Sequence, residues 1–279
     1  MSYQPVIAEE YRASVLENIH QSAICIIDED KKVVYAKGNV QMPIFYRSAM
    51  KPLQAIPVFR SGIIEKYSLR PVEAALFTAS QRGESYHVAH LQNLSKKLQI
   101  DEEQLICHAS YPLNEAPKQD YISKHLPKRK LLHNCAGKHL GFLAYAREKG
   151  YDMGSYDAPD HPLQLAIKRL VSELSETDQS EMLSGMDGCG VPVHAVPLKN
   201  MAVSYLKFAD PAMIADRKTA QAVNKISQTM GAHPEIVASH DFICTVLLAD
   251  HNIVAKGGAM GVYCLALKKE KNQHRFEST

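Results

Sequence analysis

Strand-like segments lie near both ends of this chain, and the segments between them have helical periodicity. The predicted strands are 23–28, 32–36, 242–249, 253–256 and 262–267. A chain with this order favours a single α+β domain over 1–279, in which an antiparallel sheet is flanked by helices. The polar tail, 268–279, is expected to be frayed.

The middle of the chain carries the helices of this prediction. Apolar spacing and glycine stop signals predict helices over 50–59, 88–98, 137–149, 162–174 and 214–230. Residues 191–196 are predicted to form an edge strand because they include Pro192. Residues 150–160 are predicted to be a loop, and no internal repeat is present.

The charge of the chain argues against polyanionic partners. Lys and Arg total 32 against 30 Asp and Glu, which gives a formal net charge of +2. This balance favours neither nucleic acid nor an anionic membrane as partner. No apolar run approaches the length of a membrane span, and the N-terminal residues do not resemble a signal peptide. We therefore expect a cytoplasmic protein with reduced cysteines.

Ser48 and Lys51 are the first candidates for catalysis. Three residues apart in a helical turn, their side chains lie on one side, so the amine could take the proton of the hydroxyl. Pro52 fits only the first turn of a helix and places the helix start here. The same spacing recurs at Ser204 and Lys207, which we interpret as a helix surface position.

Five polar islands interrupt the periodic segments. Each combines a nucleophile, base or metal-ligand type with glycine or another small residue, as expected where backbone approaches a ligand closely. The islands are 47–51, 78–84, 134–139, 185–190 and 256–259. Taken from the residues alone, Cys135 and Cys189 indicate either a cysteine nucleophile or part of a metal site. Arg47 is a candidate partner for a substrate carboxylate.

The residues of these islands, and their order along the chain, resemble those of a known family. Arg-Ser-x-x-Lys, Ala-Ser-x-x-Gly-Glu, Asn-Cys-x-Gly-Lys-His, Asp-Gly-Cys and a late Lys-x-Gly-Ala follow one another as in L-asparaginases of the Rhizobium etli type. The resemblance covers roughly 14–267. It implies a fold similar to serine β-lactamases and glutaminases, and a homodimer.

The resemblance also implies a catalytic centre with two serine–lysine pairs. Ser48 would attack the substrate and Lys51 would accept its proton, whereas Ser80 and Lys256 would orient the substrate, relay protons or assist the leaving ammonia. A lysine can act as a base only when burial or another cation lowers its pKa.

A zinc ion is the cofactor that the resemblance implies. Its ligands would be Cys135, Lys138 and Cys189, with water completing the site and Asp187 supporting it. Thiolates are common zinc ligands, whereas an amine coordinates only when it is neutral. The ion would lie beside the substrate without activating the attacking water, and Arg47, Lys138 and Asp187 would contact the substrate.

The predicted reaction is hydrolysis of L-asparagine to L-aspartate and ammonia through an acyl-enzyme. The sequence departs from the family pattern at Gln81, at Met260 and within 241–244, where relatives usually carry histidine, glutamate and arginine. Two alternatives therefore remain. One is a glutaminase or another Ser-x-x-Lys amidase, and the other is a zinc or amino-acid binding homologue with impaired catalysis.

Overall fold

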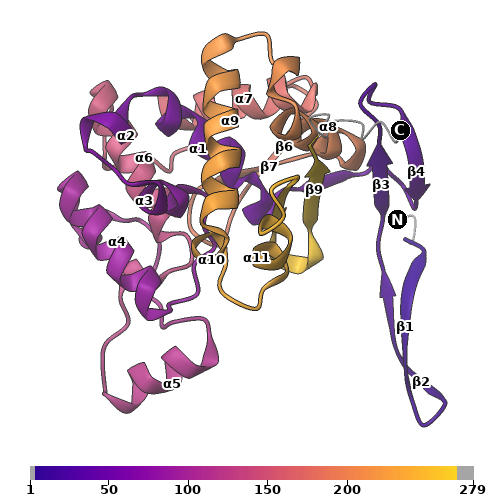
Figure 1. Ribbon diagram of the computed structural model, residues 1–279, viewed down its shortest axis with the longest axis horizontal. Coiled ribbons are helices and arrows are strands. Elements are labelled where there is room, and N and C mark those ends of the chain that lie inside the picture. The colour runs from indigo at the N-terminus through magenta and orange to yellow at the C-terminus, as the bar shows by residue number, and fades with distance from the viewer. Residues whose placement is uncertain (1–3, 269–279) are drawn as a thin grey trace, which may run out of the picture.

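The protein is an α+β unit with a helical body and projecting β-hairpins. It is described by a computed structural model that covers residues 4–268, so the predicted frayed tail lies outside the described residues from 269 onward. Figure 1 shows the helices gathered on one side, while the hairpin β1–β2 extends away from them.

The strands form four small antiparallel sheets. Their bounds are β1 Val6–Arg12, β2 Val15–Gln21, β3 Ile24–Ile27, β4 Val33–Lys37, β5 Pro43–Phe45, β6 Leu183–Met186, β7 Pro192–Pro197, β8 Ile253–Gly257 and β9 Tyr263–Leu267. The sheets are β1–β2, β3–β4, β5–β7–β6 and β8–β9. The prediction of one antiparallel sheet is therefore wrong. A cleft of about 580 Å³ lies between hairpins β3–β4 and β8–β9, and residues of β3, α8 and β9 line it.

Helices make up most of the body. The α-helices are α1 Lys51–Arg60, α2 Ile63–Lys66, α3 Pro71–Ala75, α4 Ser85–Leu98, α5 Glu115–Ser123, α6 Ala136–Lys149, α7 Pro162–Ser175, α8 Leu198–Ala209, α9 Arg217–Ala232, α10 Pro234–Val237 and α11 Ile243–Leu248. Short 3₁₀ turns are η1 Arg47–Met50, η2 Leu76–Thr78, η3 Glu102–Gln104, η4 Lys130–Leu132, η5 Pro211–Met213 and η6 Ala259–Gly261. The five predicted helices are all present, with ends shifted by a few residues.

Helix α1 lies at the centre of the body. Every residue from Lys51 to Phe59 is buried, and α1 contacts α6, α7 and α9. A helix buried on all sides is expected to be apolar around its circumference, and α1 departs from this only at Lys51 and Gln54. Burying an amine at the start of a central helix is costly unless its protons find acceptors.

Two predicted strands differ in the structure. The segment 242–249 forms helix α11 instead of a strand, although its β-branched residues favour a strand. Cys244 and Leu248 are buried one helical turn apart, whereas Ile243 and Val246 are exposed, so tertiary packing selects the helix.

Strand β7 lies between β5 and β6 and is therefore a central strand, not the predicted edge strand. Its two prolines, Pro192 and Pro197, occupy its ends and pair with Met186 and Pro43. The interior residues keep their amide protons for the ladder, so proline at the strand ends does not prevent pairing on both sides.

The Ser204 and Lys207 pair is buried in α8, so its interpretation as a surface position was wrong. The Ser204 hydroxyl lies 2.8 Å from the Tyr46 hydroxyl and donates to Met201 O at 2.7 Å. The Lys207 amine donates to Glu173 O at 2.9 Å and pairs with Glu176. These contacts give the pair a structural role.

The N-terminal hairpin β1–β2 was not predicted. Most of its residues are exposed on both faces, so the alternation of buried and exposed positions that marks a strand is weak. Within residues 4–268, no helix is both long enough and apolar enough to span a bilayer.

Candidate active site

The helix start predicted at the Ser48 segment is confirmed. The turn η1 carries Ser48, and α1 begins at Lys51 with Pro52 in its first turn. Arg47 adopts a left-handed backbone conformation with φ of 50°. A residue other than glycine is strained in this region, and such strain is often found at functional sites.

Lys51 is almost fully buried, with 1% of its surface exposed. Its amine donates to Ala79 O at 2.6 Å, to Ser80 Oγ at 3.0 Å and to Asn134 O at 3.3 Å. These three acceptors use all three protons of an ammonium group. The buried amine of Lys51 is therefore fully hydrogen-bonded in this arrangement.

Lys256, in β8 near the C-terminal end of the sequence, also contacts Ser80. Its amine donates to Ser80 Oγ at 2.9 Å and to Gly257 O at 2.8 Å. Burial, together with the positive charge of Lys51, lowers the pKa of Lys256 to about 8. Near that pH a substantial fraction of Lys256 is a neutral amine that can accept a proton.

Ser80 therefore lies between two buried lysines. Its backbone is fixed on the other side by a hydrogen bond from Ser80 N to Val237 O at 2.7 Å. The structure brings Ser80, Lys51 and Lys256 together as the sequence predicted. It adds that Lys51 contacts the serine of the second pair.

Ser48 is half-buried on η1, one turn before Lys51. Within the described part of the chain, its hydroxyl makes no hydrogen bond, so the expected contact between Ser48 and the Lys51 amine is not formed. The reason is that all three protons of Lys51 already meet other acceptors.

Two glycines allow the segments of this site to approach closely. A Cβ at Gly137 would lie 2.2 Å from Leu76 O, so α6 can pack against η2 only without a side chain there. A Cβ at Gly258 would lie 2.8 Å from Tyr46 O, next to the start of η1. These approaches bring Lys138 and Lys256 toward the serines.

The predicted metal ligands also lie together. Lys138 is 2% exposed, and its amine donates to Cys189 Sγ at 3.0 Å, while Cys135 and Cys189 are each 2% exposed. Contact with the Cys189 thiol and the positive charges of Lys51 and Lys138 hold the pKa of Cys135 well below its ordinary value. Burial acts to lower the pKa of Lys138, but the sulfur atoms outweigh it and raise the pKa.

Cys135, Cys189 and Lys138 could hold a zinc ion if metal binding displaced the ammonium proton of Lys138. In residues 4–268, no group of three or more His, Cys, Asp and Glu side chains is arranged to hold a metal. A site here therefore needs the amine of Lys138 as third protein ligand, with Asp187 Oδ2 at 3.7 Å from Cys189 Sγ. Two thiols, an amine and water would complete a tetrahedron.

Arg47 and Asp187 form an ion pair. Arg47 Nε donates to Asp187 Oδ1 at 2.8 Å, and the two side chains are 32% and 11% exposed. The pair joins the segment that carries Ser48 to the segment that carries Cys189. Both residues are accessible from solvent, which suits their predicted role in binding an amino acid.

Gln81 has a structural role in this protein. Its amide nitrogen donates to the carbonyl oxygens of Leu131, Leu132 and His133, and its amide oxygen accepts from Gly83 N at 2.6 Å. The side chain is fully buried. It fixes the segment that ends in Asn134, whose carbonyl receives the Lys51 amine.

Sequence reasoning missed the backbone carbonyls of Ala79, Asn134 and Val237. A carbonyl is present at every position, so side-chain identity gives no signal for its use. His139, which belongs to the 134–139 island, lies within hydrogen-bonding distance of the Tyr156 hydroxyl at 2.7 Å. Burial holds its pKa well below the ordinary value, so it stays neutral.

Fold and site together define an α+β protein with a buried serine–lysine centre beside two thiols. A sequence model described as L-asparaginase II matches residues 8–273, nearly the whole chain. The chain therefore belongs to the L-asparaginase II family and is an asparaginase-type amidohydrolase. No curated protein matches the chain.

Proposed function

We propose that this protein hydrolyses the side-chain amide of L-asparagine to give L-aspartate and ammonia through an acyl-enzyme. The observation that carries the proposal is the convergence of Lys51 and Lys256 on Ser80 Oγ, at 3.0 and 2.9 Å, with Ser48 on the turn that precedes Lys51. An amide needs an activated nucleophile and a proton donor for the leaving nitrogen, and this group of residues can supply both.

The proton path begins at Lys51. Lys51 passes a proton to the Ser80 hydroxyl, which gives its own proton to neutral Lys256. The neutral amine of Lys51 then accepts the proton of Ser48 as Ser48 Oγ attacks the amide carbon. Ser80 serves as the relay because it is within hydrogen-bonding distance of both amines.

Collapse of the tetrahedral intermediate breaks the C–N bond. The proton that Lys51 took from Ser48 goes to the leaving nitrogen, and ammonia departs. Water then attacks the ester carbonyl while Lys51 accepts a proton from it. Lys51 passes this proton to Ser48 Oγ as the ester C–O bond breaks, which releases L-aspartate and restores Ser48, and Ser80 relays the proton of Lys256 back to Lys51.

Substrate recognition follows from the Arg47 and Asp187 pair. A substrate α-carboxylate would bind the Arg47 guanidinium, which offers donors in a planar fork. The substrate ammonium would bind the Asp187 carboxylate. Each charge of the amino-acid head group would thus take the place of one partner in the Arg47–Asp187 ion pair.

We propose Cys135, Lys138 and Cys189 as ligands of a zinc ion, with Asp187 beside them. The ion would supply positive charge that helps hold the amino-acid head group. The supporting observation is the burial and contact of these donors. Metal analysis of protein purified without chelator checks the proposal, and protein free of zinc would contradict it.

Ammonia release from a panel of amides tests the proposed function. L-Asparagine should be the best substrate, with L-glutamine and other amides much slower, because the proposed head-group contacts fix the position of the side-chain amide. Chelator should raise KM more than it lowers kcat. Faster turnover of L-glutamine would indicate a glutaminase. Thermal stabilisation by L-asparagine without ammonia release would indicate a binding protein.

The pH dependence of turnover tests the proton path. Neutral Lys256 is required, and its pKa is about 8. The value of kcat/KM should therefore rise with pH, about tenfold per unit well below 8, and level off above it. Measurements of ammonia release over a pH range that brackets 8 check this. A profile that is flat there would remove Lys256 from the path.

We also propose a homodimer, in which the N-terminal hairpins contact a second copy of the chain. An isolated two-stranded hairpin is marginally stable in water, and β1–β2 exposes Tyr11, Leu16 and Ile19. Sedimentation of the intact protein measures the assembly, and a monomer at micromolar concentration would contradict the proposal.

A further inference from the structure

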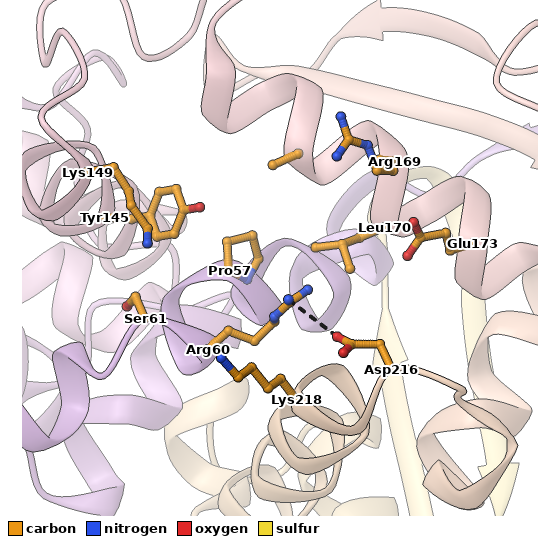
Figure 2. Close-up of a pocket in the computed structure, with 11 residues that line it drawn as sticks. Pro57, Arg60, Ser61, Tyr145, Lys149, Arg169, Leu170, Glu173, Asp216 and Lys218 are labelled. Atoms are coloured by element: carbon orange, nitrogen blue, oxygen red, sulfur yellow. Dashed lines mark ion pairs between the residues drawn. The ribbon is translucent and has the colours of Figure 1, made fainter.

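A polar cleft lies at the C-terminal end of the central helix α1. It has a volume of about 450 Å³ and is bounded by α1, α6, α7 and α9. Figure 2 shows side chains from all four helices around it. Lys51 begins α1 and Arg60 ends it, so the cleft is roughly 13 Å along the helix from the serine–lysine centre.

Four cationic side chains line this cleft. They are Arg60 from α1, Lys149 from α6, Arg169 from α7 and Lys218 from α9. The carboxylates of Glu173 and Asp216 also line it, which leaves a formal charge of +2. The whole chain of 279 residues carries the same net charge, so the cleft is more positive than the chain as a whole for its size.

Two of the four cations of the cleft have partners in the protein: Lys149 Nζ lies 5.8 Å from the centroid of the Tyr145 ring, and Arg60 donates to Thr219 Oγ1 at 2.9 Å. Arg60 pairs with Asp216 at 3.3 Å, drawn as the dashed line in Figure 2. Asp216 also caps α9 by accepting from Thr219 N and Thr219 Oγ1. Among the described residues, the side chains of Lys149, Arg169 and Lys218 make no ion pair and no hydrogen bond.

Helix dipoles account for only part of this charge. Arg60 and Lys149 lie in the last turns of α1 and α6, where cations are favoured. Arg169 lies in the middle of α7, where the dipole has little effect. Lys218 lies in the first turn of α9, where a cation is unfavourable. The last two positions therefore call for another explanation.

The remaining surface of the cleft suits a small organic molecule. Pro57 and Leu170 give it apolar walls, and the hydroxyl of half-buried Tyr145 points toward its centre in Figure 2. Burial raises the pKa of Tyr145, so the hydroxyl stays protonated and can donate. The volume lies in the range of small-molecule sites.

We propose that this cleft binds a small organic anion that carries at least two negative charges, held by Arg60, Arg169 and Lys218. Guanidinium groups bind carboxylate and phosphate with similar geometry. The shared chemistry is therefore a pair of anionic groups, and the source is either a phosphate or a polycarboxylate. The site does not depend on the proposed hydrolysis.

Isothermal titration of the whole protein with inorganic pyrophosphate and with citrate tests the proposal. Saturable binding of at least one probe is expected, and the probe that binds identifies the phosphate or the carboxylate class. The double variant R169Q/K218Q should weaken binding by roughly tenfold or more, because each contact to a charged group is worth more than about 1 kcal/mol. Both side chains are exposed, so the variant should fold normally.

Two further variants make the test specific. Arg217→Gln removes a neighbouring exposed cation that does not line the cleft, and it should leave the dissociation constant unchanged. Glu173→Gln removes a carboxylate from the cleft and should tighten binding. Absence of saturable binding of both probes, or equal weakening by Arg217→Gln, would overturn the proposal.

Discussion

Replacing Ser48 by alanine should abolish ammonia release from L-asparagine, with a loss in kcat of about 10⁴-fold or more. Ser80→Ala should lower kcat less, by about 10²- to 10³-fold, because it removes the proton relay and leaves the nucleophile. The two variants differ by one oxygen atom each from the natural protein. Steady-state ammonia assays on matched preparations measure both values.

The chain offers its own control for this comparison. Ser204 has the same spacing to a lysine, but its hydroxyl contacts Tyr46 and Met201 O. Ser204→Ala should lower the free energy of unfolding by about 1 kcal/mol and keep turnover. If Ser80→Ala abolishes turnover while Ser48→Ala retains it, then Ser80 is the nucleophile and Lys256 its base.

Lys256→Met should lower kcat by about 10²-fold or more while leaving the protein folded. Methionine has a similar length and no charge. The shift in pKa from 10.5 to about 8 means that charged Lys256 is disfavoured in the fold below pH 8. That cost is largest at low pH and is relieved as pH rises between about 8 and 10.5, because the unfolded chain then binds more protons.

Removal of the positive charge of Lys256 should therefore preserve the stability of the fold. The free energy of unfolding of Lys256→Met at neutral pH should not fall by more than about 1 kcal/mol, since relief of desolvation offsets the lost hydrogen bonds. Urea unfolding followed by circular dichroism measures it. Normal turnover by this variant would show that Lys256 takes no part in proton transfer.

Lys207→Met is the matched control. Lys207 is also buried, but its amine binds Glu173 O and the Glu176 carboxylate on the structural side of α8. This variant should be less stable and should keep the turnover of the natural protein. The two lysine variants thus have opposite effects on activity and on stability, which separates catalysis from folding.

The sequence by itself determined five of the eleven α-helices in the described residues, and several strands. The five predicted helices follow from apolar residues spaced by one turn, and Gly150 ends α6 as a glycine C-cap should. Hairpins β3–β4 and β8–β9 follow from short apolar runs around polar turns. Pro52 placed the start of α1 because proline fits only the first helical turn. These are local properties that neighbouring residues decide.

The sequence also identified the polar islands, and the structure brings Lys51, Ser80 and Lys256 into contact. The five islands lie between residues 47 and 259, and the matching family model covers this whole range within 8–273. Residue types and their spacing select the participants. They do not fix which amine meets which hydroxyl.

Only the tertiary structure decided those contacts. Lys51 turns to Ser80 and away from Ser48 because the carbonyls of Ala79 and Asn134 take its other protons. The segment 242–249 became helix α11 because packing of Cys244 and Leu248 outweighed strand propensity. Such choices depend on groups distant in the chain, and burial makes each unpaired donor costly. The local sequence pattern thus identified Ser48 and Lys51 as candidate residues. The tertiary structure determined which acceptors the Lys51 amine contacts.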